Sequence, residues 1–372
     1  VTKDTYIYMR QNKQNQIIYF FPDLQIGGVE KNFFLISKYL STFFKQNFLI
    51  TSNKIDNKID GKIKLIKVSK FWSYINRRLL FIVCTLKLFL VCLKTNKTII
   101  FSFQGNFYAI IISILLKKKI IIRSNLSPQG WGSSSLKIKV FKFLLSKVDL
   151  IIVNSDDFRK EMKKIFNVNP MTIYNPINKN EIAKLSVYKK KIKFFEKKTI
   201  NLINVGRLVD QKNQIEILLS LIKLKSLIKN YRLLIVGYGP EKNSLEKFIN
   251  RNKLKKFVKI VFTKNPYKYI NMSDVFILSS KYEGLPNVLQ EAAYLNKYII
   301  SSNCKTGPKE IIKKYTYGEL YKAGSINELS SKLKKLNKKK LNSKKKKFST
   351  NLKVFDYKKN LEKYLSGVNK LV

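Results

Sequence analysis

Two glutamates, Glu283 and Glu291, stand eight positions apart directly after the apolar run "DVFIL". Their carboxylates can accept hydrogen bonds from hydroxyl groups. The turn between them leads into a helix, and the free backbone N–H groups at a helix start favour an anion. The pattern therefore predicts a site for a ligand with hydroxyl groups and phosphate. The turn consists of Gly284, Leu285, Pro286 and Asn287, with the proline expected in the first helical turn.

Two cations lie five positions apart in "GRLVDQKNQ", a loop that opens a helix near Asn213. Arg207 offers a planar fork of donors and Lys212 a mobile point charge, which together suit a diphosphate. The chain has 74 Lys+Arg, so this spacing alone is weak support. Its weight comes from the expected position at the edge of a sheet.

Glycine turns open two further helices. Gly27 and Gly28, in "PDLQIGGVEKN", allow backbone N–H groups to approach a ligand at a helix start near Val29. No GxGxxG follows, so a dinucleotide fingerprint is not supported. In "VGYGPE", Gly237 and Gly239 can serve equally as a structural turn or as a loop lining a ligand.

The elements that carry these loops are short apolar runs alternating with helix-length segments, which is typical of parallel strands covered on both faces. The sequence therefore predicts an α/β fold with two doubly wound, Rossmann-like sheets, whose ligands bind beyond the carboxyl ends of the strands. The expected strands are residues 16–21, 47–51, 63–68, 98–103, 119–123 and 150–154, then 200–206, 232–237, 258–262, 274–278 and 298–301.

A lysine-rich segment with few strand signals, residues 173–198, marks the expected seam between two domains. We expect an N-terminal domain at 1–176 and a second domain at 177–350. A terminal helix in 351–372 would return to the first domain. The lysine run 332–347 is interpreted as a solvated face or loop.

The composition excludes few functions. A net charge of +51 attracts nucleic acid, anionic lipid and phosphates alike, but the lysines are spread along the whole chain, as an A+T-rich coding sequence would produce. There is no histidine, and the three cysteines show no pairing or zinc spacing, which indicates a reducing compartment and no zinc site. Without a signal peptide or a membrane span, a cytoplasmic or peripheral protein is expected.

Four motifs in this order make the chain resemble the retaining glycosyltransferases of family 4, which have the GT-B fold. They are "GGVEKN", "GRLVDQKN", "VGYGPE" and "EGLPNVLQE". The likeness covers residues 16 to 365 and implies two Rossmann-like domains facing each other across a cleft. It also implies that the N-terminal domain, 1–176, lies on the acceptor side and that the C-terminal domain, 177–350, binds the nucleotide sugar. Less specific segments, including "RSNLSPQGW", resemble bacterial members that build lipid-linked surface saccharides such as O-antigen, capsule or lipopolysaccharide.

The resemblance also implies roles. Glu291 would hold the ribose hydroxyls and Glu283 a hydroxyl of the donor sugar, while Arg207 and Lys212 neutralise the diphosphate. The backbone of residues 284–287 and the loop at Gly237 would contact the donor, and Gly27 and Gly28 would approach its phosphate from the other domain. The donor is expected to be UDP carrying a hexose or N-acetylhexosamine, with no metal or other cofactor.

Asn125, with neighbouring Arg123, corresponds to a cleft position where many family members have a histidine. The family's retaining, front-face displacement would have to proceed here without an imidazole, with Asn125 or the backbone in its place. Two alternatives stay open: a GT-B nucleotide-sugar 2-epimerase, and a polycationic nucleic-acid-binding protein without specific recognition motifs.

Residues 71–94 combine Trp72, Tyr74, Arg77 and Arg78 with a long apolar body. This segment is interpreted either as a helix buried against the first sheet or as a helix at a membrane surface, and the two are compatible. Salt-sensitive binding to anionic lipid is expected, together with a lipid-linked acceptor.

Overall fold

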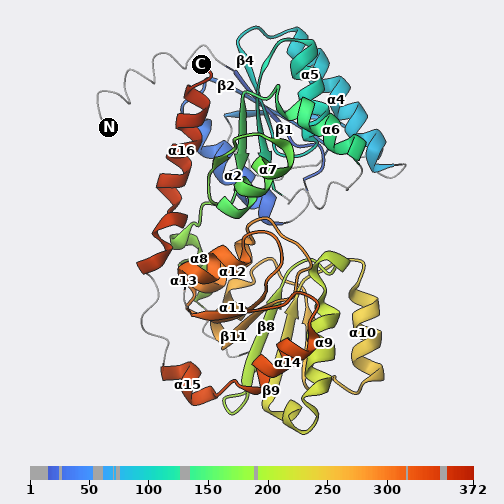
Figure 1. Ribbon diagram of the computed structural model, residues 1–372, viewed down its shortest axis with the longest axis vertical. Helices are drawn as coiled ribbons and strands as arrows, with labels where there is room; N and C mark the ends of the chain where they lie inside the picture. The colour runs from blue at the N-terminus through green and yellow to red at the C-terminus, as the bar shows by residue number, and fades with distance from the viewer. Residues whose placement is uncertain are drawn as a thin grey trace. The chain divides into compact units, whose positions relative to one another are not determined.

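The chain forms two compact units, Val1–Pro176 with Lys358–Val372, and Ile177–Tyr357. Each unit is a parallel sheet with helices on both faces (Figure 1). Tyr74 and parts of the segments 123–131 and 332–347 lie outside the described residues. The computed structural model describes residues 16–24, 27–52, 62–69, 71–72, 76–125, 135–187, 192–315, 317–343 and 350–372.

The first unit contains a seven-stranded parallel sheet in the order β3-β2-β1-β4-β5-β6-β7. The strand order reverses between β1 and β4, which pair in register from Gln16↔Thr98 to Phe20↔Ser102. Its central strands are buried along their whole length, as the apolar runs predict. The strands are β1 (Gln16–Phe20), β2 (Gln46–Thr51), β3 (Ile63–Lys67), β4 (Thr98–Ser102), β5 (Lys119–Ser124), β6 (Leu150–Val153) and β7 (Met171–Thr172).

Four helices of this unit cover one face of the sheet, because every connection from β3 onward crosses in the same direction. The other face is covered by α2 and α16, where Tyr19 of β1 packs edge-on against Phe33 and Phe101 of β4 against Tyr364. The helices are α2 (Gly28–Leu40), α4 (Arg77–Leu93), α5 (Asn106–Leu115), α6 (Ser135–Leu145), α7 (Asp156–Phe166) and α16 (Tyr357–Asn369).

The second unit contains a six-stranded parallel sheet in the order β10-β9-β8-β11-β12-β13. Here the order reverses between β8 and β11. The prediction of two doubly wound parallel sheets is confirmed, although β7 and β13 were not predicted. The strands are β8 (Ile200–Val205), β9 (Tyr231–Val236), β10 (Val258–Val261), β11 (Val275–Leu278), β12 (Tyr298–Ser302) and β13 (Gly318–Tyr321).

A single hydrophobic core holds α9, α10 and α14 against one face of this sheet, with Leu218, Leu245 and Leu329 among its buried members. The helices and 3-10 turns are α8 (Lys179–Ser186), η3 (Asp210–Lys212), α9 (Gln214–Lys223), η4 (Lys225–Asn230), α10 (Lys242–Arg251), α11 (Tyr267–Met272), α12 (Asn287–Tyr294), α13 (Pro308–Tyr315), α14 (Ile326–Lys334), α15 (Lys338–Ser343) and η5 (Thr350–Phe355).

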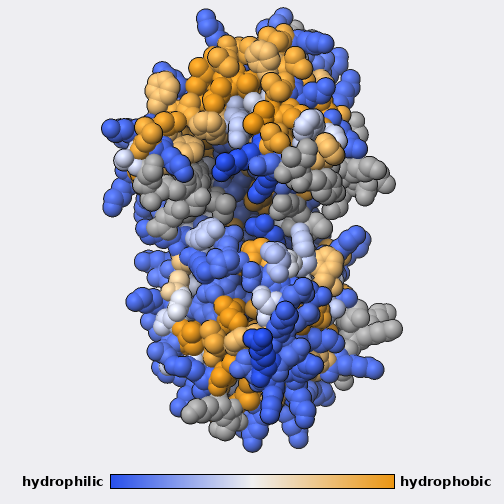
Figure 2. Space-filling model, turned by 90° about the vertical axis from the view of Figure 1, so that its right-hand side faces the viewer, coloured by the Kyte–Doolittle hydropathy of each residue, from blue (hydrophilic) through white to orange (hydrophobic). Residues whose placement is uncertain are grey.

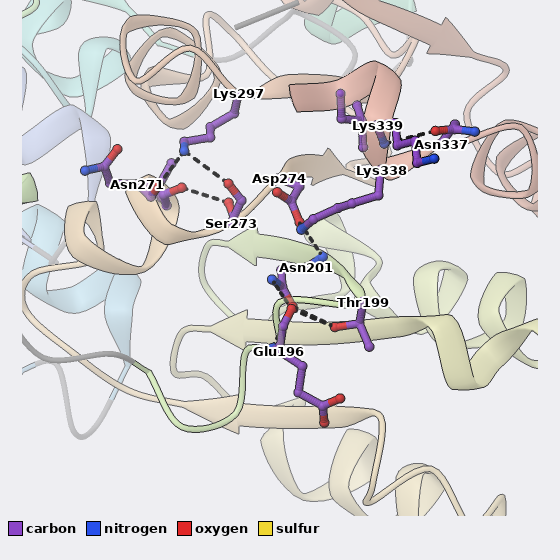
Figure 3. A network of polar contacts seen from close by, with 12 residues as sticks. Glu196, Thr199, Asn201, Asn271, Ser273, Asp274, Lys297, Asn337, Lys338 and Lys339 are labelled. Carbon is purple, nitrogen blue, oxygen red and sulfur yellow. Dashed lines mark hydrogen bonds and ion pairs between the residues drawn. The ribbon is translucent and has the colours of Figure 1, made fainter. Parts of the chain in front are cut away.

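A polar network closes the amino edge of the second sheet (Figure 3). Buried Asp274, just before β11, accepts a hydrogen bond from the backbone N–H of Asn201 at 2.8 Å and pairs with Lys338. Nζ of Lys297, just before β12, donates to the carbonyl of Ser273 at 3.1 Å. These charged groups form hydrogen bonds and an ion pair at the amino ends of the strands, and so they stabilise the sheet. Ligands of such sheets bind at the opposite, carboxyl edge.

Candidate functional site

The loops after β8 and β11 meet at the point where the strand order of the second sheet reverses, which is where open α/β sheets bind ligands. Nζ of Lys212, from the first loop, lies 2.5 Å from Oε1 of Glu283, from the second. The Lys212 and Glu283 side chains are 16% and 8% exposed. The hydroxyl of Ser280 donates to the same oxygen at 2.6 Å. The structure thus brings these two predicted residues together in one largely buried ion pair.

The backbone of Glu283 is fixed by the loop after β12. Its N–H donates to the carbonyl of Lys305 at 2.7 Å, and its carbonyl accepts from the N–H of Thr306 at 3.0 Å. Gly307, with φ +90°, lies so close that a Cβ there would be 2.2 Å from the carbonyl oxygen of Gly284. The loop after β8 therefore holds the carboxylate of Glu283, and the loop after β12 holds its backbone. Sequence reasoning did not identify the loop after β12.

Glu291 is buried in the second turn of α12, where Oε1 accepts a hydrogen bond from the hydroxyl of Tyr267 at 3.1 Å. Tyr267 is the first residue of α11, so it too lies at the carboxyl edge of the sheet. Sequence reasoning missed it, because only the fold joins two residues 24 positions apart. The available signal was a tyrosine following Asn265-Pro266 directly after an apolar strand.

The start of α12 differs in detail from the prediction. Pro286 is the residue before the helix, in an extended conformation with φ −69° and ψ 110°, and the helix itself begins at Asn287. Gly284 and Leu285 are buried in the turn that precedes it. Pro286 therefore sets the direction in which the chain enters the helix, and α12 begins with its N-terminus at the carboxyl edge of the sheet.

Arg207 is exposed at the start of the same loop as Lys212, and its carbonyl accepts a hydrogen bond from Gln214 at 3.0 Å. The two glycines after β9 have a packing role. A Cβ on Gly237 would lie 1.9 Å from the carbonyl oxygen of Gly206, and one on Gly239 would lie 2.2 Å from that of Leu208. Close approach of the loops after β8 and β9 therefore explains why glycine is required at Gly237.

A third buried acid, Glu216, lies in the helix that follows the Lys212 loop. Glu216, in the first turn of α9, accepts a hydrogen bond from Nδ2 of Asn213 at 2.5 Å. Burial raises the pKa of Glu216 to about 7. Hydrogen bonds from Tyr321, Gly324 and Asn213 lower the pKa, but the effect of burial is larger. Glu216 is thus a carboxyl group that changes charge near neutral pH.

Cys304 follows β12 and is also buried. Burial, followed by the negative charge of Glu283, raises the pKa of the Cys304 thiol to about 12. The thiol therefore stays protonated at neutral pH and is a poor nucleophile. Among the described residues, no group of three or more acidic or cysteine side chains is placed to hold a metal ion.

Three predicted residues lie at the carboxyl edge of the first sheet. Gly27 caps the N-terminus of α2 with extended backbone (φ 178°), and Gly28 is the exposed first residue of that helix. Asn125 follows β5; its Oδ1 accepts from Arg123, and its Nδ2 donates to the carbonyl of Phe103 at 3.1 Å. Both ends of the Asn125 amide therefore have partners within the first unit.

Arg123 is completely buried and anchors the C-terminal helix. Its Nε donates to the hydroxyl of Tyr364 in α16 at 2.8 Å, and its Nη2 to Oδ1 of Asn175 at 2.5 Å. Nη1 donates to Oδ1 of Asn125, so the guanidinium of Arg123 donates to three neutral oxygen atoms in all. This network ties Tyr364 to the carboxyl end of β5 and orients the Asn125 side chain.

Comparisons with known proteins agree with this geometry. Residues 187–355 match the family model of glycosyl transferases group 1. An uncharacterized glycosyltransferase, MJ1059, from Methanocaldococcus jannaschii is 35% identical over 186 residues, which is 48% of this chain and 46% of that protein. The matched segment thus spans about half the length of this relative.

Another relative, from Campylobacter jejuni, is N-acetylgalactosamine-N,N'-diacetylbacillosaminyl-diphospho-undecaprenol 4-alpha-N-acetylgalactosaminyltransferase. It is 26% identical over 335 residues, covering 85% of this chain and 88% of that protein. The solved structure of Anabaena Alr3699/HepE in complex with UDP superposes with a TM-score of 0.75 at 14% identity, covering 95% of this chain and all of that one. Residues 187–355 therefore resemble the glycosyl transferases group 1 family, and the chain has the two-sheet fold of the GT-B glycosyltransferases.

Proposed function

We propose that this protein is a retaining glycosyltransferase of family 4 that transfers a sugar from a UDP-sugar to a lipid-linked saccharide. The observation that carries the proposal is the Lys212–Glu283 pair at the switch point of the second sheet. A cation and a carboxylate held there by two loops suit the two halves of a nucleotide sugar, its diphosphate and its hydroxyl groups.

In this mechanism the bond between the anomeric carbon and the diphosphate oxygen breaks, and a bond forms from an acceptor hydroxyl on the same face. The acceptor proton passes to the departing diphosphate. Lys212, with Arg207 on the same loop, stabilises the negative charge that develops on that leaving group. The second carboxylate oxygen of Glu283 accepts a hydrogen bond from a hydroxyl of the sugar. Glu291 accepts a hydrogen bond from a hydroxyl of the ribose.

One relative supports the proposed class of acceptor. The Campylobacter jejuni protein is named for an acceptor on diphospho-undecaprenol, and its match extends over both units of this chain. This supports an acceptor carried on a polyprenyl diphosphate. We further propose that the protein acts in the biosynthesis of a surface polysaccharide, at the cytoplasmic face of a membrane. No observation favours a nucleotide-sugar 2-epimerase or a nucleic-acid-binding protein.

The test is incubation of the purified chain with UDP-N-acetylgalactosamine or UDP-glucose, with and without a saccharide on diphospho-undecaprenol. We expect a longer lipid-linked saccharide, and an α linkage in the product, only when the acceptor is present. Conversion of the donor to its 2-epimer without acceptor would instead identify an epimerase. An inverted linkage would contradict the retaining mechanism but not the transfer itself.

A further inference from the structure

Helices α4, α5 and α6 lie side by side on one face of the first sheet (Figure 1). The inner side of α4 is an apolar row that packs into the core of this unit. The row repeats every four residues and consists of Leu80, Cys84, Leu88 and Cys92. This packing matches one of the two interpretations of residues 71–94, a helix buried against the first sheet.

The outer side of α4 is apolar as well. A second row runs along it at intervals of three and four residues, so that its members lie on one face of the helix. On a surface helix this face normally carries polar side chains. The row consists of Leu79 (37% exposed), Ile82 (44%), Leu86 (58%), Leu90 (51%) and Leu93 (56%).

The same pattern continues on the two neighbouring helices, where Leu115 on α5 and Leu136 on α6 are 65% and 70% exposed. In Figure 2 hydrophobic side chains form a broad area over this part of the first unit, at the top of the view. Contiguous apolar surface of this kind marks an interaction site. The other members are Phe107 and Ile114 on α5, and Val140 and Phe143 on α6.

The charge of these helices restricts the partner. Their sequences contain six lysines and arginines and no aspartate or glutamate. Lys139 lies three positions after Leu136 and four before Phe143, so it belongs to the outer face of α6, where a long side chain can extend its amine past the apolar surface. Two copies of this face placed together would bring cations against cations, which disfavours a second copy as the partner.

We propose that this surface, the outer rows of α4, α5 and α6, docks on a lipid bilayer that contains anionic headgroups. The leucines enter the interfacial layer, while cations such as Lys139 pair with headgroup phosphates. Attachment is at one leaflet: among the described residues, no helix combines the length and the hydropathy needed to cross a membrane. Docking needs neither donor nor acceptor, so it is independent of the proposed sugar transfer.

The experiment is flotation of the purified chain with vesicles of phosphatidylglycerol and phosphatidylcholine, compared with phosphatidylcholine alone. The diagnostic variant is the double substitution Leu86→Ser/Leu90→Ser, which leaves the net charge unchanged. Because both leucines are more than half exposed, the fold should survive, as thermal unfolding will verify. The matched control is Val187→Ser in the second unit, an apolar residue that is 72% exposed.

We expect the wild type and Val187→Ser to float with anionic vesicles. The double variant should partition about thirtyfold less, or about 2 kcal/mol, since two leucines no longer bury apolar area in the membrane. Equal flotation of wild type and double variant would mean attraction by bulk charge and would overturn the proposal. So would a wild type that does not float, or a stable dimer that the double substitution disperses.

Discussion

Lys212 and Glu283 are joined by a 2.5 Å ion pair that connects the loops on either side of the switch point of the second sheet. Ser280 donates to the same carboxylate oxygen, Oε1. Both of these contacts are made to Oε1. In the described part of the chain, Oε2 of Glu283 can therefore accept a hydrogen bond from a sugar hydroxyl. The pair also keeps the Lys212 amine at the edge of the sheet, where a diphosphate would arrive.

Glu283→Gln should separate the two roles of this pair. The amide keeps the shape of the side chain but loses its charge, so we expect the transfer rate to fall by about 100-fold, roughly 2.7 kcal/mol. UDP should bind at least as tightly as before, because the Lys212 charge is no longer neutralised. The checks are a single-turnover transfer assay and calorimetric titration with UDP. Unchanged turnover would remove Glu283 from the mechanism.

Arg207→Ala tests the second cation without disturbing the fold. The side chain is exposed, so the free energy of unfolding should change by less than about 0.5 kcal/mol. Transfer should be nearly abolished, because the leaving diphosphate loses a charge-assisted hydrogen bond. Arg251→Ala is the matched control, since that arginine is also exposed and lies in the last turn of α10. Equal losses in both variants would indicate a nonspecific effect of charge.

Glu291 and Tyr267 can be tested through the ligand. If Glu291 binds the ribose, the wild type should prefer UDP over 2′-deoxy-UDP by about tenfold, or 1.4 kcal/mol, and Glu291→Ala should lose that preference. Tyr267→Phe removes one hydrogen bond to the carboxylate and should reduce the preference partly. Calorimetric titration with both nucleotides measures it. A preference that persists in Glu291→Ala would show that the ribose is bound elsewhere.

The sequence predicted the architecture because buried parallel strands form nearly continuous apolar runs, as in β6 and β11. It missed β13, "GELY", since a four-residue edge strand with one glycine and one glutamate lacks that signal. Motif positions indicated Glu283 and Lys212, but their ion pair depends on loops 71 residues apart. Ser280, Thr306 and Tyr267 were missed for the same reason. Whether Asn125 acts in transfer stays a prediction.

The buried Glu216 should make stability depend on pH. Its pKa is about 7 in the folded state, whereas an ordinary glutamate has a pKa near 4.5, so the folded state keeps the proton that the unfolded state loses. Stability therefore falls as pH rises from about 4.5 through 7, by roughly 3 kcal/mol in total. Glu216→Gln, which resembles the protonated form, should lack this contribution.

Denaturant unfolding of the wild type and of Glu216→Gln across this pH range measures the effect. The difference between the two proteins should be small at the acid end and should favour the glutamine variant above pH 7, in line with the sign of the shift. A difference that does not change with pH would mean that Glu216 is ionised in the folded protein.

Calorimetric titration of UDP into the wild type, Lys212→Ala and Lys223→Ala tests the central proposal most directly. Lys223 is an exposed lysine at the far end of α9, so it controls for the high net charge of the chain. We predict that UDP binds the wild type and Lys223→Ala alike, and that Lys212→Ala weakens binding at least tenfold, about 1.4 kcal/mol. Equal affinity of all three proteins for UDP, or no binding by any of them, would contradict a donor site at the carboxyl edge of the second sheet.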